Sequence, residues 1–158
     1  MSVNDPSTPA SQTTTITPYL SIGSLYSSYD PFDVIVNLAY RYDGDGFKRH
    51  QVTTSFTKGK TIINVGIHDL PSEPLDTILP ILLPILRIHH KYDSRILVHC
   101  QAGRSRSGAV AIAFLAEVEN LSYEDALAMI QAKRPIVLPN EGFSRMVNIF
   151  LKNNGIPK

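Results

Sequence analysis

One loop constrains this chain more than any other stretch: residues 99–108, with the sequence HCQAGRSRSG. An apolar run, Ile96–Val98, precedes the loop and is typical of a buried strand, and an apolar, alanine-rich run over 109–116 follows it and is typical of a buried helix. The predicted order is therefore strand, tight loop, helix. Such a loop ends where a helix presents unpaired backbone N–H groups and the positive end of its dipole, which together bind anions. We therefore predict an anion site in this loop.

The loop carries the only cysteine of the chain, Cys100, and an arginine six positions later, Arg106. A helix N-terminus and a nearby guanidinium lower a cysteine pKa from about 8.5 to between roughly 3.5 and 7.5, so we expect a thiolate at neutral pH. Arg106 offers a planar fork of donors that matches two oxygens of a phosphate. Ser107 supplies a hydroxyl suited to stabilising the sulfur as a leaving group. These groups predict phosphoryl transfer to sulfur.

A cysteine that follows an apolar strand is more often a small buried hydrophobic residue than a nucleophile. Here the Cys-x5-Arg spacing, the glycines at 103 and 108 and the strand-loop-helix order occur together, and they favour the reactive role. A nucleotide-binding loop is excluded, because neither GxxxxGK[ST] nor GxGxxG occurs in the chain.

These residues resemble the signature loop of the cysteine-dependent protein tyrosine phosphatases, and the AGxSRS form is similar to the dual-specificity branch. Further runs that resemble this branch cover nearly the whole chain: Ile16–Ser24, Ala126–Leu127, Lys133–Pro135 and Pro139–Phe143. The resemblance implies a protein phosphatase that hydrolyses phosphotyrosine, phosphoserine and phosphothreonine through a cysteinyl-phosphate intermediate. It implies no cofactor.

The resemblance also implies a set of site residues. The phosphate-binding residues would be those of the loop itself: Gln101, Ala102, Gly103, Arg104, Ser105 and Arg106. His99 would orient the loop by hydrogen bonding, and Asn140 would support it from the Pro139–Phe143 run. Met146 stands where the family often carries a glutamine, so the positioning of water falls to another group.

Breaking a phosphate ester at neutral pH also requires an acid that protonates the leaving oxygen. Asp69 follows a predicted strand and lies about 30 residues before the cysteine, a placement that resembles the family acid. It would also serve as the base for water. Asp76, on the following helix, and Asp93, in the turn before the signature strand, are the alternatives.

Strand and helix patterns alternate along the chain. Predicted strands cover 19–22, 33–38, 61–67 and 96–98, and predicted helices cover 24–32, 75–90, 109–116, 123–132 and 141–151, with Ser122 as an N-cap. This order predicts an α/β domain with a mostly parallel central sheet covered by helices on both faces. Pro80 and Pro84 each cost about 3 kcal/mol inside a helix, so we expect a kink or a helix that starts near Pro80.

The length of 158 residues fits one domain. We expect a flexible polar tail over 1–15, a phosphatase-like domain over 16–158 and a solvated turn over 42–46. A single cysteine excludes internal disulfides and fits a reducing compartment, the cytosol or nucleus. His68, His89 and His90 lack a second ligand type at metal spacing, so we expect no metal. The most apolar stretch, 78–88, is interrupted by two prolines and is too short to span a membrane.

Two other functions compete with the protein phosphatase. Arg104 adds a second cation to the loop, as in phosphatases of phosphoinositides or RNA 5′-ends, but Gln101 is neutral and the chain has no basic run. The net charge of +1 favours neither nucleic acid nor membrane as a partner. A non-catalytic phosphate-binding module is the third function, and the intact Cys100 and Arg106 argue against it.

Overall fold

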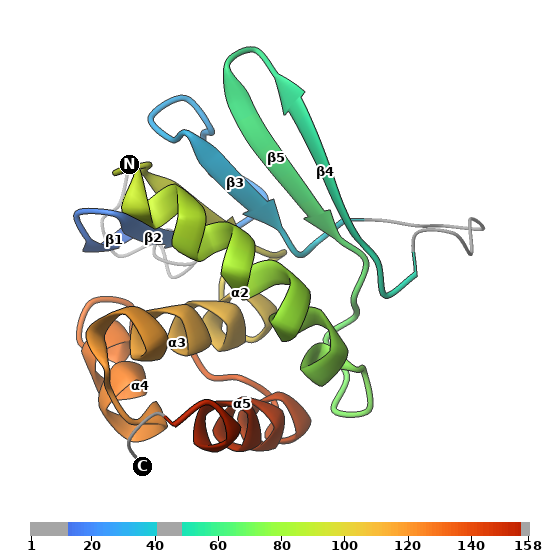
Figure 1. Ribbon diagram of the computed structural model, residues 1–158, viewed down its shortest axis with the longest axis vertical. Coiled ribbons are helices and arrows are strands. Elements are labelled where there is room, and N and C mark those ends of the chain that lie inside the picture. The colour runs from blue at the N-terminus through green and yellow to red at the C-terminus, as the bar shows by residue number, and fades with distance from the viewer. Residues whose placement is uncertain (1–12, 41–48, 156–158) are drawn as a thin grey trace, which may run out of the picture.

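A computed structural model describes residues 13–40 and 49–155, which build a six-stranded sheet with helices packed against it (Figure 1). The strands, in chain order, are β1 Thr14–Thr17, β2 Leu20–Gly23, β3 Val34–Asn37, β4 Val52–Thr57, β5 Lys60–Val65 and β6 Ile96–His99. Their order across the sheet is β1-β2-β6-β3-β5-β4. The four inner strands are parallel and the two outer pairs are antiparallel. The predicted α/β class and the mostly parallel sheet are confirmed.

Four helices follow: α2 Leu75–Lys91, α3 Arg106–Glu119, α4 Tyr123–Gln131 and α5 Glu141–Asn153. Their buried side chains form one core with alternate sheet residues such as Val36 and Val98, so these helices cover one face. The other face carries a small cluster of Phe32, Ile35 and Leu97. We expected helices on both faces; in the described part of the chain the second face is covered by the segment before β3.

The register of the inner strands explains where the site forms. Asn37 of β3 lies beside His99 of β6 on one side and beside Asn64 of β5 on the other. The carboxyl ends of β3, β5 and β6 therefore meet at one edge of the sheet. The segments that leave these strands begin at that edge, where ligands of open α/β sheets bind.

Three local features differ from the sequence-based expectations. Segment 24–32 forms turns instead of a helix, because the hydroxyls of Ser24, Ser27 and Ser28 accept nearby backbone N–H groups in place of helical bonds. Strand β4 was not expected; it pairs with β5 through a two-residue turn with positive φ at Lys58 and Gly59. Strand β1 begins inside the expected tail, while residues 1–12 and the turn over 42–46 lie outside the described residues.

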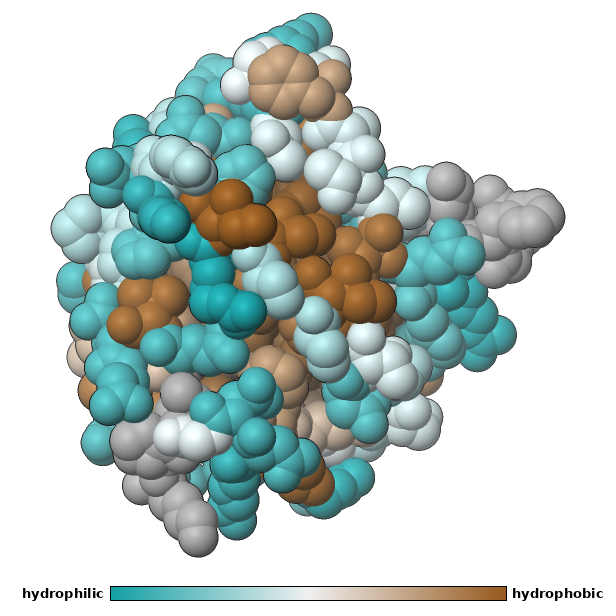
Figure 2. Space-filling model, viewed as in Figure 1, coloured by the Kyte–Doolittle hydropathy of each residue, from teal (hydrophilic) through white to brown (hydrophobic). Residues whose placement is uncertain are grey.

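Helix α2 runs from Leu75 through both prolines instead of starting near Pro80. Six buried apolar side chains hold it against the core: Leu75, Ile78, Leu79, Leu82, Leu83 and Leu86. At about 1.5–3 kcal/mol each, their burial outweighs two proline costs of about 3 kcal/mol. Apolar surface also gathers over the region of α2 in Figure 2. Ile81 and Ile88 of this helix are exposed. No described helix combines the length and hydropathy that crossing a membrane requires.

Candidate active site

Cys100 leaves the carboxyl end of β6 and is 3% exposed. Its Sγ lies 3.2 Å from the hydroxyl of Ser107. Burial raises the pKa of the thiol, but the Ser107 hydroxyl, the backbone N–H groups of Ser107 and Arg104, and the charge of Arg106 outweigh burial and lower the pKa below its ordinary value. The surroundings of Cys100 therefore favour its thiolate form.

Arg106 is the first residue of α3, and its guanidinium is anchored at one end. Nη1 donates to the carbonyl oxygens of Leu38, at 3.0 Å, and Ile67, at 3.1 Å, which follow β3 and β5. Nε is buried and has no hydrogen-bond partner among the described residues. A buried donor without a partner costs about 1–3 kcal/mol, and an oxyanion bound next to the thiolate would remove that cost.

Arg134, for which no sequence pattern indicated a role in the site, binds the loop on the side away from Cys100. It is only 2% exposed, and it donates from Nε to Gly103 O at 2.9 Å and from Nη2 to Ala102 O at 3.3 Å. The Gly103 carbonyl shares a planar peptide with the N–H of Arg104, which therefore points the other way, toward the Cys100 thiolate. Gly103 has φ +66°, and a Cβ there would overlap Arg134 and the Gly23 carbonyl.

We expect Arg134→Met to raise the pH at which Cys100 becomes reactive. The substitution leaves two loop carbonyls without their donor and removes a nearby positive charge, so the thiolate loses support. The midpoint of Cys100 alkylation by iodoacetamide, followed against pH, should move up by about one unit. Arg95→Met, at an exposed arginine, is the control and should leave the midpoint in place. An unchanged midpoint in Arg134→Met would contradict the assignment.

His99, the last residue of β6, directly precedes Cys100 and is buried. Its Nδ1 lies 3.3 Å from the Cys100 carbonyl oxygen, which can only accept, so Nδ1 carries the hydrogen. Nε2 then accepts from the hydroxyl of Tyr29 at 2.7 Å. Burial and the charge of Arg106 lower the pKa of His99 although the Cys100 carbonyl raises it, so the ring is neutral. Tyr29 lies in the segment that was expected to be a helix, so no sequence signal connected it to His99.

Asp69 lies in the segment between β5 and α2 and is exposed. Its Oδ1 accepts from Asn140 Nδ2 at 2.9 Å, and the backbone N–H of Asn140 donates to Ser105 Oγ at 2.9 Å. Asn140 also caps α5 by accepting from the backbone N–H of Phe143. A Cβ at Gly142 would overlap the Pro71 carbonyl, so the Asp69 segment rests directly on the first turn of α5. Asn140 thus connects the acid segment to the signature loop.

The other candidate residues lie as follows. Gln101, Ala102 and Arg104 are exposed at the rim of the loop. Asp93 lies in a turn at the amino end of β6, which is the end opposite Cys100. Asp76 lies in the first turn of α2. Of the three candidate acids, the structure brings only Asp69 into hydrogen-bonded connection with the loop.

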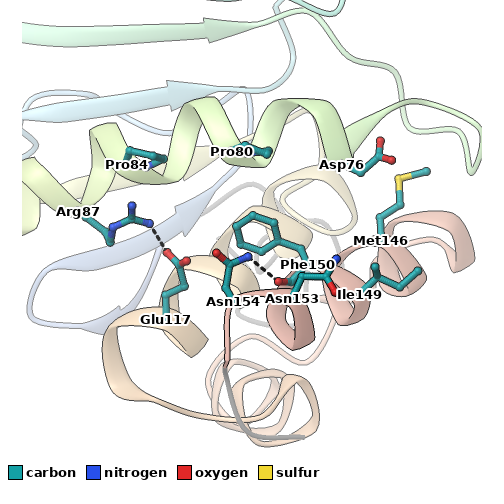
Figure 3. Close-up of a pocket in the computed structure, with 10 residues that line it drawn as sticks. All are labelled: Asp76, Pro80, Pro84, Arg87, Glu117, Met146, Ile149, Phe150, Asn153 and Asn154. Atoms are coloured by element: carbon teal, nitrogen blue, oxygen red, sulfur yellow. Dashed lines mark hydrogen bonds and ion pairs between the residues drawn. The ribbon is translucent and has the colours of Figure 1, made fainter.

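A separate pocket of about 490 Å³ lies between α2 and α5 (Figure 3). Asp76, Pro80 and Pro84 line it from α2, and Met146 and Phe150 line it from α5. No residue of 99–108 lines this pocket, so it is not the site of the nucleophile. Within the described ranges, no group of three or more histidine, cysteine, aspartate or glutamate side chains is arranged to hold a metal ion.

Comparisons with known proteins identify the family of this chain. The family model of the dual specificity phosphatase catalytic domain matches residues 26–153. Mouse dual specificity protein phosphatase 19 is 28% identical over 142 residues, which cover 85% of this chain and 60% of that protein. Putative tyrosine phosphatase 123R of Invertebrate iridescent virus 6 is 29% identical over 130 residues, which cover 77% of this chain and 92% of that protein.

Solved structures are similar over almost the whole chain. A mouse putative dual specificity phosphatase, crystallised with zinc tungstate, superposes with a TM-score of 0.74 at 25% identity and covers 99% of this chain and 96% of that one. The chain spans 26% of the length of a probable dual specificity protein phosphatase of Dictyostelium discoideum and 60% of the mouse relative. With a family model matched over most of its length, the chain belongs to the dual specificity phosphatase family.

Proposed function

We propose that this protein is a dual-specificity protein phosphatase, which hydrolyses phosphotyrosine, phosphoserine and phosphothreonine through a cysteinyl-phosphate intermediate. The observation that carries the proposal is the pairing of Cys100, whose thiol pKa is lowered, with the unpartnered buried Nε of Arg106. One group is a nucleophile and the other is an anion clamp, and both belong to one loop. The family of the chain supports the same chemistry.

In the first step, Cys100 Sγ attacks the phosphorus of the bound ester. Arg106 and the N–H groups of the loop bind the non-bridging oxygens, whose charge they neutralise in the transition state. The bond from phosphorus to the leaving oxygen breaks while a new phosphorus–sulfur bond forms. Asp69, held beside the loop by Asn140, delivers a proton to the leaving oxygen.

In the second step, water attacks the phosphorus and the phosphorus–sulfur bond breaks. Asp69, now ionised, takes the proton from water. The Ser107 hydroxyl, 3.2 Å from Sγ, donates to the sulfur as it regains negative charge. Met146, which stands where the family often carries a glutamine, lines the pocket between α2 and α5.

We expect Asp69→Asn to change the pH dependence of kcat/KM. In the wild type the rate should rise as Cys100 ionises, at a pH below the ordinary range of a thiol because its pKa is lowered. It should fall again at alkaline pH, the bell shape of a reaction that needs both an ionised nucleophile and a proton donor. Asparagine cannot donate this proton, so the alkaline fall disappears. With phenyl phosphate, a poor leaving group, kcat should drop by about 10²- to 10⁴-fold, and the loss should be smaller with p-nitrophenyl phosphate.

Asp76→Asn is the matched control for this experiment, because Asp76 is also exposed and lies at the start of α2. It should keep the alkaline fall and the wild-type kcat. Loss of the alkaline fall in Asp76→Asn, with Asp69→Asn unaffected, would transfer the role of the acid to Asp76.

A panel of substrates tests the proposed function itself. Phosphotyrosyl and phosphothreonyl peptides should be hydrolysed in preference to a short-chain phosphoinositide and to triphosphorylated RNA, because the chain has net charge +1 and no basic run for either polyanion. Preference for the lipid or the RNA would contradict the proposal of a protein substrate.

We also propose that the enzyme acts in phosphate signalling in the cytosol or nucleus. This proposal is supported by its nucleophilic thiolate, which works only when reduced.

A further inference from the structure

The peptide unit between Ile67 and His68 is held from both sides. Its carbonyl oxygen accepts from Arg106 Nη1 at 3.1 Å, and its N–H, on His68, donates to Glu73 Oε1 at 2.9 Å. Because a peptide is planar, the orientation of the N–H decides the orientation of the carbonyl. Glu73 is therefore connected, through one rigid unit, to the arginine of the phosphate loop.

Glu73 is a fixed acceptor. It is 6% exposed, and its second oxygen, Oε2, lies 3.1 Å from Nε2 of His50. Burial alone would raise the pKa of the carboxyl group. The His68 N–H, the hydrogen bond from His50 and the charges of both histidines outweigh burial, so the pKa of Glu73 lies below its usual value. The carboxylate is ionised at neutral pH and has a donor at each oxygen.

His50 is itself held by the sheet. Its backbone N–H donates to Gly66 O at 2.7 Å, and the N–H of Gly66 donates to Gln51 O at 3.1 Å, which extends the pairing of β4 and β5 beyond their ends. The ring of His50 thus contacts Glu73, while the backbone of His50 is hydrogen-bonded to Gly66, at the start of the segment that carries Asp69. Asp69, the residue after His68, is bound from the other side by Asn140.

We propose that Glu73 is a positioning residue that orients both the phosphate clamp, Arg106, and the proposed acid, Asp69. Through the Ile67–His68 peptide it aims the carbonyl that anchors Arg106, and at the same peptide it fixes the point from which Asp69 extends. This inference rests on the proposed function. Glu73 touches neither substrate nor sulfur, so its effect passes entirely through Arg106 and Asp69.

Glu73→Ala and Glu73→Gln test the proposal, with Glu124→Ala, at an exposed glutamate of α4, as the control. Alanine removes the acceptor, so kcat for phenyl phosphate should fall by about 10- to 100-fold through misplacement of the reacting groups. The loss with p-nitrophenyl phosphate should be smaller, because that leaving group depends less on Asp69. Glutamine keeps an oxygen for the His68 N–H and should stay within about fivefold of wild type.

Binding of tungstate and inorganic phosphate reports on Arg106 without turnover. Both should bind less tightly to Glu73→Ala, and to His50→Phe, a milder variant that remains informative if the alanine variant does not fold. The proposal is overturned if Glu73→Ala has a lower melting temperature but binds both anions and hydrolyses both substrates like the wild type. A wild type that binds phosphate without hydrolysing any ester would instead reject the proposed function, and the anion affinities would still decide the role of Glu73.

Discussion

Cys100→Ser is expected to abolish hydrolysis while the protein still binds phosphate. A serine hydroxyl stays protonated at neutral pH, so the attacking anion is lost, and removal of a nucleophile of this kind lowers kcat by about 10⁴-fold or more. Arg106 and the backbone N–H groups of the loop remain in place. Since the buried thiolate that repels an oxyanion is gone, tungstate should bind at least as tightly as to the wild type.

Two measurements check this prediction. Single-turnover assays with p-nitrophenyl phosphate report the chemical step, and calorimetric titration with tungstate reports binding. Near-unchanged melting temperature would show that the fold is intact. Activity of Cys100→Ser within about tenfold of wild type would exclude the covalent mechanism. The remaining loop binds phosphate but supplies no nucleophile, so binding alone cannot account for such a rate. Equal inactivity of the wild type would leave a phosphate-binding module, the function that the intact Cys100 argues against.

Arg106→Lys is expected to be nearly as severe, although it conserves the charge. Lysine offers one ammonium group, so it cannot both donate to the carbonyls of Leu38 and Ile67 and bind two oxygens of the phosphate. Loss of this clamp should lower kcat by about 10²- to 10³-fold, the effect of removing one group that stabilises transition-state charge. Phosphate affinity should fall as well, because Nε, the unpartnered donor, is missing.

The matched control is Arg95→Lys, at an exposed arginine beside the Phe32 ring. It conserves charge in the same way and should leave kcat and phosphate affinity unchanged. If Arg106→Lys kept kcat within about threefold of wild type, a single positive charge would be enough for catalysis. The proposed two-point binding of phosphate by the guanidinium would then be rejected. Steady-state kinetics with inhibition by inorganic phosphate measures both constants in one experiment.

Local features of the fold were predictable because each has a short-range cause. The Ser122 cap of α4 is confirmed, with the Asp125 N–H donating to its hydroxyl at 3.1 Å. The strand before Cys100 and the helix after Ser105 follow from runs of apolar residues. Strand β4 was missed because its side chains are mostly exposed, so its sequence shows no buried alternation and only its pairing with β5 makes it a strand.

The residues of the site also differ in whether local sequence or long-range contacts indicate them. The nucleophile and the clamp that we propose could be predicted from the sequence, because Cys100 and Arg106 lie within one loop of seven consecutive residues that decide their geometry. Asp69 was one of three candidates, and only its bond to Asn140, 71 residues further along the chain, connects it to that loop. The preference for Asp69 therefore rests on tertiary structure, because this hydrogen bond depends on how α5 packs against the segment after β5.

Sequence alone was therefore enough to predict the chemistry that we propose for this protein: a thiolate in an anion-binding loop between a buried strand and a buried helix. Only the tertiary structure decided what holds that loop in place. Arg134 reaches back 31 residues to Gly103, and Tyr29 reaches forward 70 residues to His99. Neither side chain belongs to a periodic pattern or a local motif. Such contacts arise when buried polar groups must find partners in a packed core, and the partner depends on which elements the fold brings together.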